Sequence, residues 1–201
     1  MARYERKDHF HQRAKREGFR SRAAYKLAEI QRAERLLGAG QRVVDLGCWP
    51  GGWLQVAAAA VGPSGRVVGI DLAEIEPPLA NENVFSFTGD LTEPSVLERV
   101  LETLAGWADV VLCDAAPKLT GVRAVDRAAE EALLTSVEAA LPRLLRPGGA
   151  LLLKILEGPE AQAIDRRIRS RFQRAKTLRP GASRKGTSER YLIARGYRGP
   201  G

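Results

Sequence analysis

The sequence predicts an α/β protein built on a mostly parallel, seven-stranded sheet with helices on both faces. Three observations lead to this expectation. Apolar, strand-like segments alternate with helix-like segments along the 201 residues, which is the order of successive βαβ units. The strand-like segments are continuous apolar runs, as expected for strands that are buried on both faces. The last two strands are joined by a short loop, so we expect the last strand to be antiparallel to its neighbour.

The first half of the chain begins with a predicted helix at residues 21–37, with Ser21 as its N-cap and Gly38 as its end. Short apolar runs that are bounded by turn residues favour buried strands, and longer segments with apolar residues on one face favour helices. The elements expected next are strand 42–47, helix 54–60, strand 66–72, strand 84–90, helix 95–106 and strand 108–114.

The second half continues with a long predicted helix at residues 126–145, which Pro147, Gly148 and Gly149 end. The remaining expected elements are strand 150–156, helix 160–172 and two last strands near 175–179 and 190–196. A chain of 201 residues fits one domain, and no internal repeat or linker divides it. We therefore expect a single domain at residues 21–201, preceded by a basic N-terminal extension at residues 1–20.

The charge is unevenly distributed along the chain. The net charge is +8, with +4 in residues 1–20, +10 in residues 165–201 and −6 in the stretch between them. An acidic body with basic ends predicts a polyanionic partner that the ends contact. The alternative is that arginine-rich helices only keep the protein soluble.

Several classes of protein are not expected from this composition. No apolar run approaches the roughly 20 residues that cross a bilayer, and the N-terminal residues lack the apolar core of a signal peptide. We expect a cytoplasmic protein without a membrane partner. Cys48 and Cys113 are isolated, and His9 and His11 lie in a polar segment without cysteine neighbours. We therefore expect neither a disulfide framework nor a metal site.

Acidic residues lie at the carboxyl ends of the predicted strands, where open parallel sheets bind ligands. They are Asp45, Asp71, Asp90 and Asp114. Each has an ordinary explanation, which for Asp71 is the N-cap of a helix. Together they indicate a ligand at this edge of the sheet, because their negative charge suits a cationic molecule.

A glycine-rich loop follows the first strand, where Gly47, Gly51 and Gly52 allow a ligand to approach the backbone closely. The loop is not a phosphate-binding loop of the Walker type, because Trp53 stands where that motif has lysine, and it lacks the G-x-G-x-x-G pattern. Asp71 lies 19 residues after Gly52, where it can accept hydrogen bonds from ribose hydroxyls. These features predict an adenosine-type ligand that no phosphate-binding loop holds. S-adenosylmethionine fits that description. The alternative is a tight turn without a ligand.

Lys154 interrupts the apolar run ALLLKIL of a predicted central strand. Burial of a lone ammonium group is costly, so this lysine needs a partner or must lose its proton. Its strand follows that of Asp114 by one crossover, which places the two residues at adjacent carboxyl ends. The alternative is that Lys154 lies in an exposed edge strand, where its charge prevents pairing with another chain. Taken alone, Lys26 is an ordinary surface lysine, and Glu189 is an ordinary acidic residue at the end of a strand.

The chain resembles the FtsJ/RrmJ family of ribose 2′-O-methyltransferases, which act on large-subunit ribosomal RNA. The segments that carry this resemblance are SRAAYKLAEIQ, VVDLGCWPGGW, GIDL, GDLTE, VVLCDAAPKLTG, LLRPGGALLLKILEG and SRKGTSERYLIA, from about residue 20 to the end. The resemblance implies a Rossmann-like, S-adenosylmethionine-dependent methyltransferase fold. It also implies a target uridine in the A-loop of the assembled large subunit.

The resemblance assigns roles to individual residues. It implies a catalytic tetrad of Lys26, Asp114, Lys154 and Glu189. It implies cofactor-binding positions at Gly51, Trp53, Asp71, Asp90 and Asp114. We expect Lys154 to act as the general base, with Asp114 orienting it and Lys26 and Glu189 positioning the ribose. Two residues depart from the family pattern: Trp49 replaces a small residue, and Lys118 replaces asparagine.

We expect basic residues to hold the RNA by its phosphates, as polyanion binding requires. The candidates are Arg166, Arg167, Arg169, Arg171 and Arg174 on one predicted helix, Arg184 and Lys185 before Glu189, and Arg3, Arg6, Arg13 and Arg16 in the N-terminal extension. Three other functions stay open at this point. They are a transfer RNA anticodon-loop methyltransferase, a nicotinamide-dependent oxidoreductase and a non-catalytic RNA-binding assembly factor.

Overall fold

The computed structural model describes residues 9–117, 120–155, 159–183 and 189–200. Within these residues, seven strands form one sheet in the order β3-β2-β1-β4-β5-β7-β6. The strands are β1 (Arg42–Leu46), β2 (Arg66–Asp71), β3 (Val84–Thr88), β4 (Ala108–Cys113), β5 (Leu145–Ile155), β6 (Phe172–Leu178) and β7 (Arg190–Tyr197). The described helices are α1 (His9–Arg16), α2 (Ala24–Glu34), α3 (Gly52–Val61), α4 (Pro94–Leu104), α5 (Arg123–Leu144) and α6 (Pro159–Ser170).

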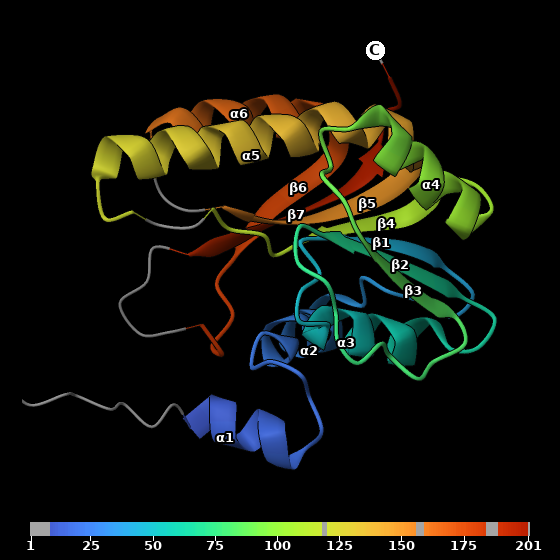
Figure 1. Ribbon diagram of the computed structural model, residues 1–201. Coiled ribbons are helices and arrows are strands. Elements are labelled where there is room, and N and C mark those ends of the chain that lie inside the picture. Colours follow the sequence, from blue (N-terminus) through green and yellow to red (C-terminus); the bar gives the residue numbers. More distant parts are fainter. Residues whose placement is uncertain (1–8, 118–119, 156–158, 184–188, 201) are drawn as a thin grey trace, which may run out of the picture.

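Helices cover both faces of the sheet, with α2 and α3 on one face and α4, α5 and α6 on the other (Figure 1). Successive strand residues point to opposite faces. Val43 and Val110 therefore pack in the core beneath α2 and α3, while Val44 and Val111 pack in the core beneath α4, α5 and α6. The strands are continuously apolar, as predicted, because each face of the sheet contributes to a separate core.

The strand directions confirm the predicted fold class. β3, β2, β1, β4 and β5 pair in parallel, whereas β7 is antiparallel to both of its neighbours, β5 and β6. Because β7 runs in reverse, its first residues lie beside the last residues of β5, and Lys154 pairs with Tyr191. One reversed strand therefore adds its N-terminal end to the edge of the sheet at which the parallel strands end.

The boundaries predicted for α2 are wrong at both ends. The helix starts at Ala24, its N-cap is Ala23, and no side chain caps it, so Ser21 is not the N-cap. The helix ends at Glu34 instead of continuing to Gly38. Leu37 is buried, and the Gln31 side chain bonds both its N–H, at 2.8 Å, and its carbonyl, at 2.7 Å. These side-chain bonds replace the helical ones and redirect the chain into the core.

The predicted boundaries around β5 and β6 also need correction. β5 begins at Leu145, so Pro147, Gly148 and Gly149 lie within the strand, at an irregularity in its pairing with β4. α6 ends at Ser170 because Phe172 starts β6 and packs on Tyr197. Sequence patterns locate such elements more reliably than their ends, which depend on tertiary packing.

The predicted N-terminal extension contains helix α1 and contacts the domain. Arg13 Nε lies 2.7 Å from Glu17 Oε1, and Tyr25 of α2 donates a hydrogen bond of 2.8 Å to Glu17 Oε2. The Arg20 backbone N–H donates to Gln55 Oε1 of α3 at 2.8 Å. The described part of residues 1–20 is therefore anchored to α2 and α3. None of the described helices combines the length and apolar character that crossing a bilayer demands.

Candidate functional site

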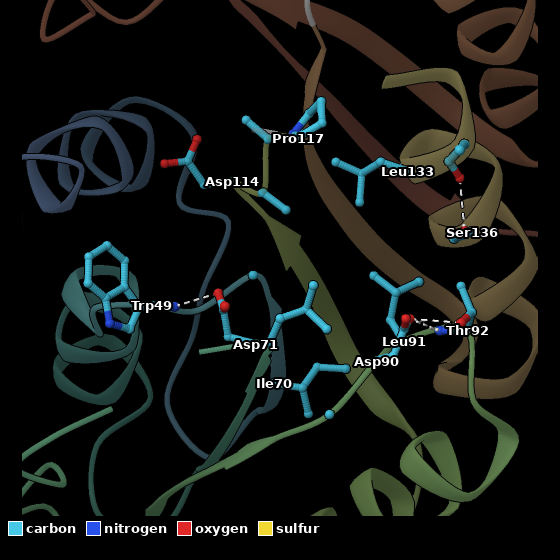
Figure 2. A pocket seen from close by; sticks show the side chains of 16 residues that line it. Trp49, Ile70, Asp71, Asp90, Leu91, Thr92, Asp114, Pro117, Leu133 and Ser136 are labelled. Carbon is cyan, nitrogen blue, oxygen red and sulfur yellow. Dashed lines mark hydrogen bonds between the residues drawn. The ribbon is translucent and has the colours of Figure 1, made fainter. Parts of the chain in front are cut away.

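A cavity of about 470 Å³ lies at the carboxyl ends of β1, β2 and β4. Its walls come from the loops that follow these strands, from residues 89–92 and from the inner side of α5. Figure 2 shows Asp71, Asp90 and Asp114 around this cavity, with Leu133 of α5 among the apolar lining. This is the position at which open parallel sheets bind ligands. It is the position that the sequence predicts.

Backbone hydrogen bonds hold the acidic groups of the cavity in place. Asp71 accepts one from Trp49 N–H at Oδ2 and one from Ala73 N–H at Oδ1, both at 2.9 Å. Asp90 Oδ1 accepts from the backbone N–H and the hydroxyl of Thr92, each at 2.8 Å. Both hydrogen bonds lower the pKa of Asp90, and the bond from the backbone N–H has the larger effect. Fixed carboxylates beside apolar walls suit a cationic adenosine derivative such as S-adenosylmethionine.

Asp45 is a carboxyl group buried within β1, next to the cavity. It is fully buried, and neither of its oxygens has a hydrogen-bond partner among the described residues. Burial raises its pKa well above the ordinary value, and the neighbouring charges of Asp114 and Asp71 raise it further. A neutral Asp45 avoids the large cost of an unpaired buried charge.

The loop after β1 is shaped by Gly47, whose φ is +77°. A Cβ atom at this position would lie 2.5 Å from Ala115 Cβ, so only glycine lets the β1 loop meet the β4 loop this closely. Trp49 lines the cavity and is 58% exposed. Gly51 and Trp53 are buried next to it without lining it, and Trp53 donates to the Ala23 carbonyl at 2.9 Å. Gly51 and Trp53 thus hold the loop in position without lining the cavity.

The structure brings the four predicted catalytic residues together beside the cavity. Lys154 Nζ lies 3.1 Å from Asp114 Oδ1 and also donates to the Asp114 carbonyl. Lys26 Nζ lies 2.8 Å from the Glu189 carboxylate. Both ion pairs are largely buried. Lys26 comes from α2 and Lys154 from β5, while Asp114 directly follows β4 and Glu189 directly precedes β7. The cluster therefore depends on the reversed direction of β7.

Tyr191 connects these two ion pairs, and sequence reasoning missed it. Its hydroxyl donates to Asp114 Oδ1 at 2.6 Å and accepts from Lys26 Nζ at 3.1 Å. The side chain is fully buried against Trp53. Burial raises the pKa of the phenol, and Asp114 and Glu189 raise it further, so it stays a protonated donor. Because Tyr191 lies in an apolar strand, its sequence surroundings do not distinguish it from an ordinary core residue.

Four of the arginines expected to hold RNA pair with acidic residues of the protein; they are Arg13, Arg167, Arg169 and Arg171. Arg167 and Arg171 pair with Glu138 of α5 at 2.8 and 3.4 Å. Arg169 pairs with Asp165 at 2.9 Å, and Arg174 lies in β6 instead of on the predicted helix. Several other residues named from the sequence lie outside the described part of the chain. They are Arg3, Arg6, Lys118, Arg184 and Lys185. Among the residues that are described, no group of three or more His, Cys, Asp or Glu side chains is arranged to hold a metal.

Comparison with known proteins adds relatives along nearly the whole chain. The model of a family described as FtsJ-like methyltransferase matches residues 19–197. The Ribosomal RNA large subunit methyltransferase E of Methanothermobacter thermautotrophicus is 40% identical over 96% of this chain and 91% of its own. The protein of the same name from Acidithiobacillus ferrooxidans is 40% identical over 96% of this chain and 87% of its own.

Two solved structures share the fold. A Plasmodium falciparum protein described as a ribosomal RNA methyltransferase has a TM-score of 0.78 at 26% identity, covering 90% of this chain and 100% of its own. Fibrillarin of Aeropyrum pernix, solved with natively bound S-adenosyl-L-methionine, has a TM-score of 0.62 at 18% identity, covering 87% and 74%. These similarities confirm the predicted Rossmann-like methyltransferase fold.

Proposed function

Because the chain belongs to the FtsJ-like methyltransferase family, whose methyl donor is S-adenosylmethionine, we propose that it methylates a ribose 2′-oxygen of large-subunit ribosomal RNA. The target is a uridine of the A-loop on the assembled subunit, in the cytoplasm. Relatives at about 40% identity carry the name Ribosomal RNA large subunit methyltransferase E, which supports the ribosomal substrate.

One observation carries the proposal: Asp114 belongs both to the cofactor cavity and to the buried lysine–carboxylate cluster. A hydroxyl group beside Lys154 Nζ would therefore lie next to the cavity as well. Reactions of this kind need the two reacting groups in line and within about 3–3.5 Å. A ribose that binds beside Lys154 and Asp114 would have its hydroxyl next to the cavity, as this requirement demands.

The residues of the cluster have distinct roles in this proposal. S-adenosylmethionine, when bound, supplies a methyl group that the sulfonium charge activates. Once it has given up its own proton, Lys154 accepts the proton of the ribose 2′-hydroxyl as that oxygen bonds to the methyl carbon and the bond from this carbon to sulfur breaks. Asp114 orients Lys154 through the 3.1 Å contact. Lys26 and Glu189 position the ribose.

The cofactor site divides into residues that line the cavity and residues that shape it. We assign Asp71 to the ribose hydroxyls of the cofactor, because it lines the cavity and backbone hydrogen bonds fix both of its oxygens. Asp90 and Asp114 complete the acidic lining. Gly51 and Trp53 contribute by holding the loop between β1 and α3 in position.

The test uses methyl-labelled S-adenosylmethionine with large subunits that lack the modification and, separately, with unmodified transfer RNA. We expect label in 2′-O-methyluridine from the subunit, and loss of at least about a hundredfold in rate for Lys154→Ala. Lys176→Ala is the matched control, because Lys176 pairs with Glu34 at 2.8 Å, away from the cavity. Its rate should equal that of the wild type.

Other outcomes of this assay separate the competing functions. Label only in transfer RNA would keep the chemistry and replace the substrate. Cofactor binding without label in either RNA would favour the non-catalytic assembly factor. Normal turnover by Lys154→Ala would exclude that lysine as the base. A separate titration should show weaker cofactor binding by Asp71→Ala, and an unchanged dissociation constant would exclude its role at the ribose.

A further inference from the structure

Glu29 on α2 holds a turn that is distant in sequence. Its Oε1 accepts from Gly181 N–H at 2.8 Å, and its Oε2 accepts from Ala182 N–H at 3.1 Å. Both N–H groups belong to the turn at residues 180–183, which Ser183 N–H closes by donating to the Pro180 carbonyl at 3.0 Å. A carboxylate that takes two adjacent backbone donors fixes both the place and the orientation of a turn.

The same turn contacts the catalytic cluster through Ser183. The Ser183 hydroxyl donates to Glu189 Oε1 at 2.8 Å, and Lys26 Nζ lies 2.8 Å from both Glu189 oxygens, donating to Oε2. Lys26 and Glu29 are three residues apart on α2, so they lie on one side of the helix. A single helix face thus holds the turn through Glu29 and holds Glu189 through Lys26.

We infer that Glu29 and Ser183 are positioning residues for the ribose-binding pair of Lys26 and Glu189. Glu29 fixes the turn at residues 180–183, and Ser183 then fixes the orientation of the Glu189 carboxylate. This inference rests on the proposed function of Glu189 and extends it to two residues that do not touch the reacting groups. Neither residue lines the cofactor cavity.

The orientation of the Glu189 carboxylate depends on all of its donors. An ion pair between flexible side chains holds two charges together but constrains their orientation only weakly. The bond from Ser183 adds a second fixed donor, and Glu189 is buried enough that water replaces such a donor poorly. Although burial raises the pKa of Glu189, the hydrogen bonds from Lys26 and Ser183 and the charges of Lys26 and Lys154 lower it by more. Glu189 therefore stays an acceptor for both donors.

The kinetic test compares Glu29→Gln, Ser183→Ala and Ser183→Thr with the wild type and with Glu34→Gln. Glu34 is the matched control, because its carboxylate lies on the same helix but pairs with Lys176. We expect kcat with large subunits to fall about tenfold for Glu29→Gln and Ser183→Ala, as loss of a hydrogen bond to a charged group implies. Ser183→Thr, which keeps the hydroxyl, should restore most of the rate. The dissociation constant of S-adenosylmethionine should stay the same in every variant.

A second comparison tests whether Ser183 acts through Glu189. In a Glu189→Ala background, Ser183→Ala should have no further effect on kcat, because its acceptor is already absent. A further loss in that background would overturn the inference, as would equal rates for Glu29→Gln, Ser183→Ala and Glu34→Gln. A weakening of cofactor binding that matches the loss in kcat would show a general structural effect instead.

A measurement without turnover separates this inference from the proposed function. We expect an NMR titration of the Glu189 carboxyl to give a higher pKa in Ser183→Ala and Glu29→Gln than in the wild type, because a donor to the carboxylate is lost or displaced. Glu34→Gln should leave that pKa unchanged. If the wild type methylates neither RNA, the proposed function fails, and the titration still decides whether Glu29 and Ser183 position Glu189.

Discussion

Tyr191 shows how one hydroxyl group joins two ion pairs. It donates to Asp114 and accepts from Lys26, at 2.6 and 3.1 Å. We expect Tyr191→Phe to lower kcat about tenfold, because Asp114 loses a donor and Lys26 loses an acceptor in a buried site. The ring packing on Trp53 is kept, so the free energy of unfolding should fall by only about 1–3 kcal/mol.

The measurements are single-turnover methyl transfer, cofactor titration and urea unfolding on the same preparation. Tyr197→Phe is the matched control, because Tyr197 is an equally buried tyrosine of β7 whose hydroxyl has no described hydrogen-bond partner. Its turnover should equal that of the wild type. An unchanged kcat for Tyr191→Phe would show that the two ion pairs act independently of the phenol.

Gly47 is the residue at which the loop after β1 tolerates no side chain. A Cβ atom there would approach Ala115 Cβ to 2.5 Å and Ala115 Cα to 2.9 Å. We expect Gly47→Ala to weaken S-adenosylmethionine binding more than tenfold, because the two loops that wall the cavity must separate. Calorimetric titration with the cofactor measures this change.

Gly18→Ala is the control that isolates the steric effect. Gly18 has nearly the same backbone angle, with φ of +76°, but nothing lies within 4 Å of the position that a Cβ atom would take there. Both variants should lose about 1 kcal/mol from the unfavourable backbone angle, and only Gly47→Ala should lose cofactor affinity. Equal cofactor affinity in the two variants would refute the steric argument.

The candidate site was only partly predictable from the residues themselves. Asp71, Asp90 and Asp114 stand out because each follows an apolar strand, and Lys154 stands out because it interrupts one. Lys26 and Glu189 have no such contrast with their surroundings, and only the family resemblance identifies them. Tyr191 could not be found by pattern, since a tyrosine in an apolar strand looks like an ordinary core residue.

At the scale of the element, β7 determines how the site is assembled. The alternating pattern of strands and helices predicted the sheet, and the short last loop predicted that β7 would be antiparallel to β6. The position of β7 between β5 and β6 is a tertiary fact that aligns Tyr191 with Lys154. Local patterns do not specify which neighbour a strand will choose, so this alignment could not be predicted from spacing.

β1 contains Asp45, whose carboxyl group is buried inside a central strand. Its folded-state pKa is raised, whereas in the unfolded chain it takes the ordinary value of 3.8. The unfolded chain therefore loses this proton first as the pH rises above about 4, which lowers the stability of the folded protein. The Asp45→Asn variant has no such proton to lose.

We therefore expect the stability difference between Asp45→Asn and the wild type to move in favour of the variant as the pH rises from about 4. The slope is at most about 1.4 kcal/mol per pH unit, the value for one proton. Urea unfolding at a series of pH values measures it. For Asp126→Asn the difference should instead move in favour of the wild type as the pH rises toward about 4 from below, because hydrogen bonds from Thr120 hold the pKa of Asp126 below its usual range. A constant difference for Asp45→Asn would mean that Asp45 is ionised in the folded protein.

At the scale of the whole molecule, the distribution of charge predicts an RNA-binding surface, but the structure changes which residues supply it. The net charge of residues 165–201 is +10, yet Arg167, Arg169 and Arg171 neutralise acidic groups of the protein's own helices. A sequence shows how many charges a segment carries, but it does not show which of them pair with other residues in the folded protein. The N-terminal extension is the other basic segment.

We expect the affinity for RNA to fall linearly with salt on logarithmic axes, and deletion of residues 1–16 to make that slope shallower. The deletion removes six basic and two acidic residues, and each lost phosphate contact lowers the slope by about 0.7–0.9. The paired variant Arg167→Gln/Arg171→Gln removes two basic residues that Glu138 already engages, so its slope should match that of the wild type. Filter binding of the A-loop RNA over a salt series measures all three slopes. A shallower slope for the arginine variant and an unchanged slope for the deletion would assign RNA binding to α6 instead of the N-terminal extension.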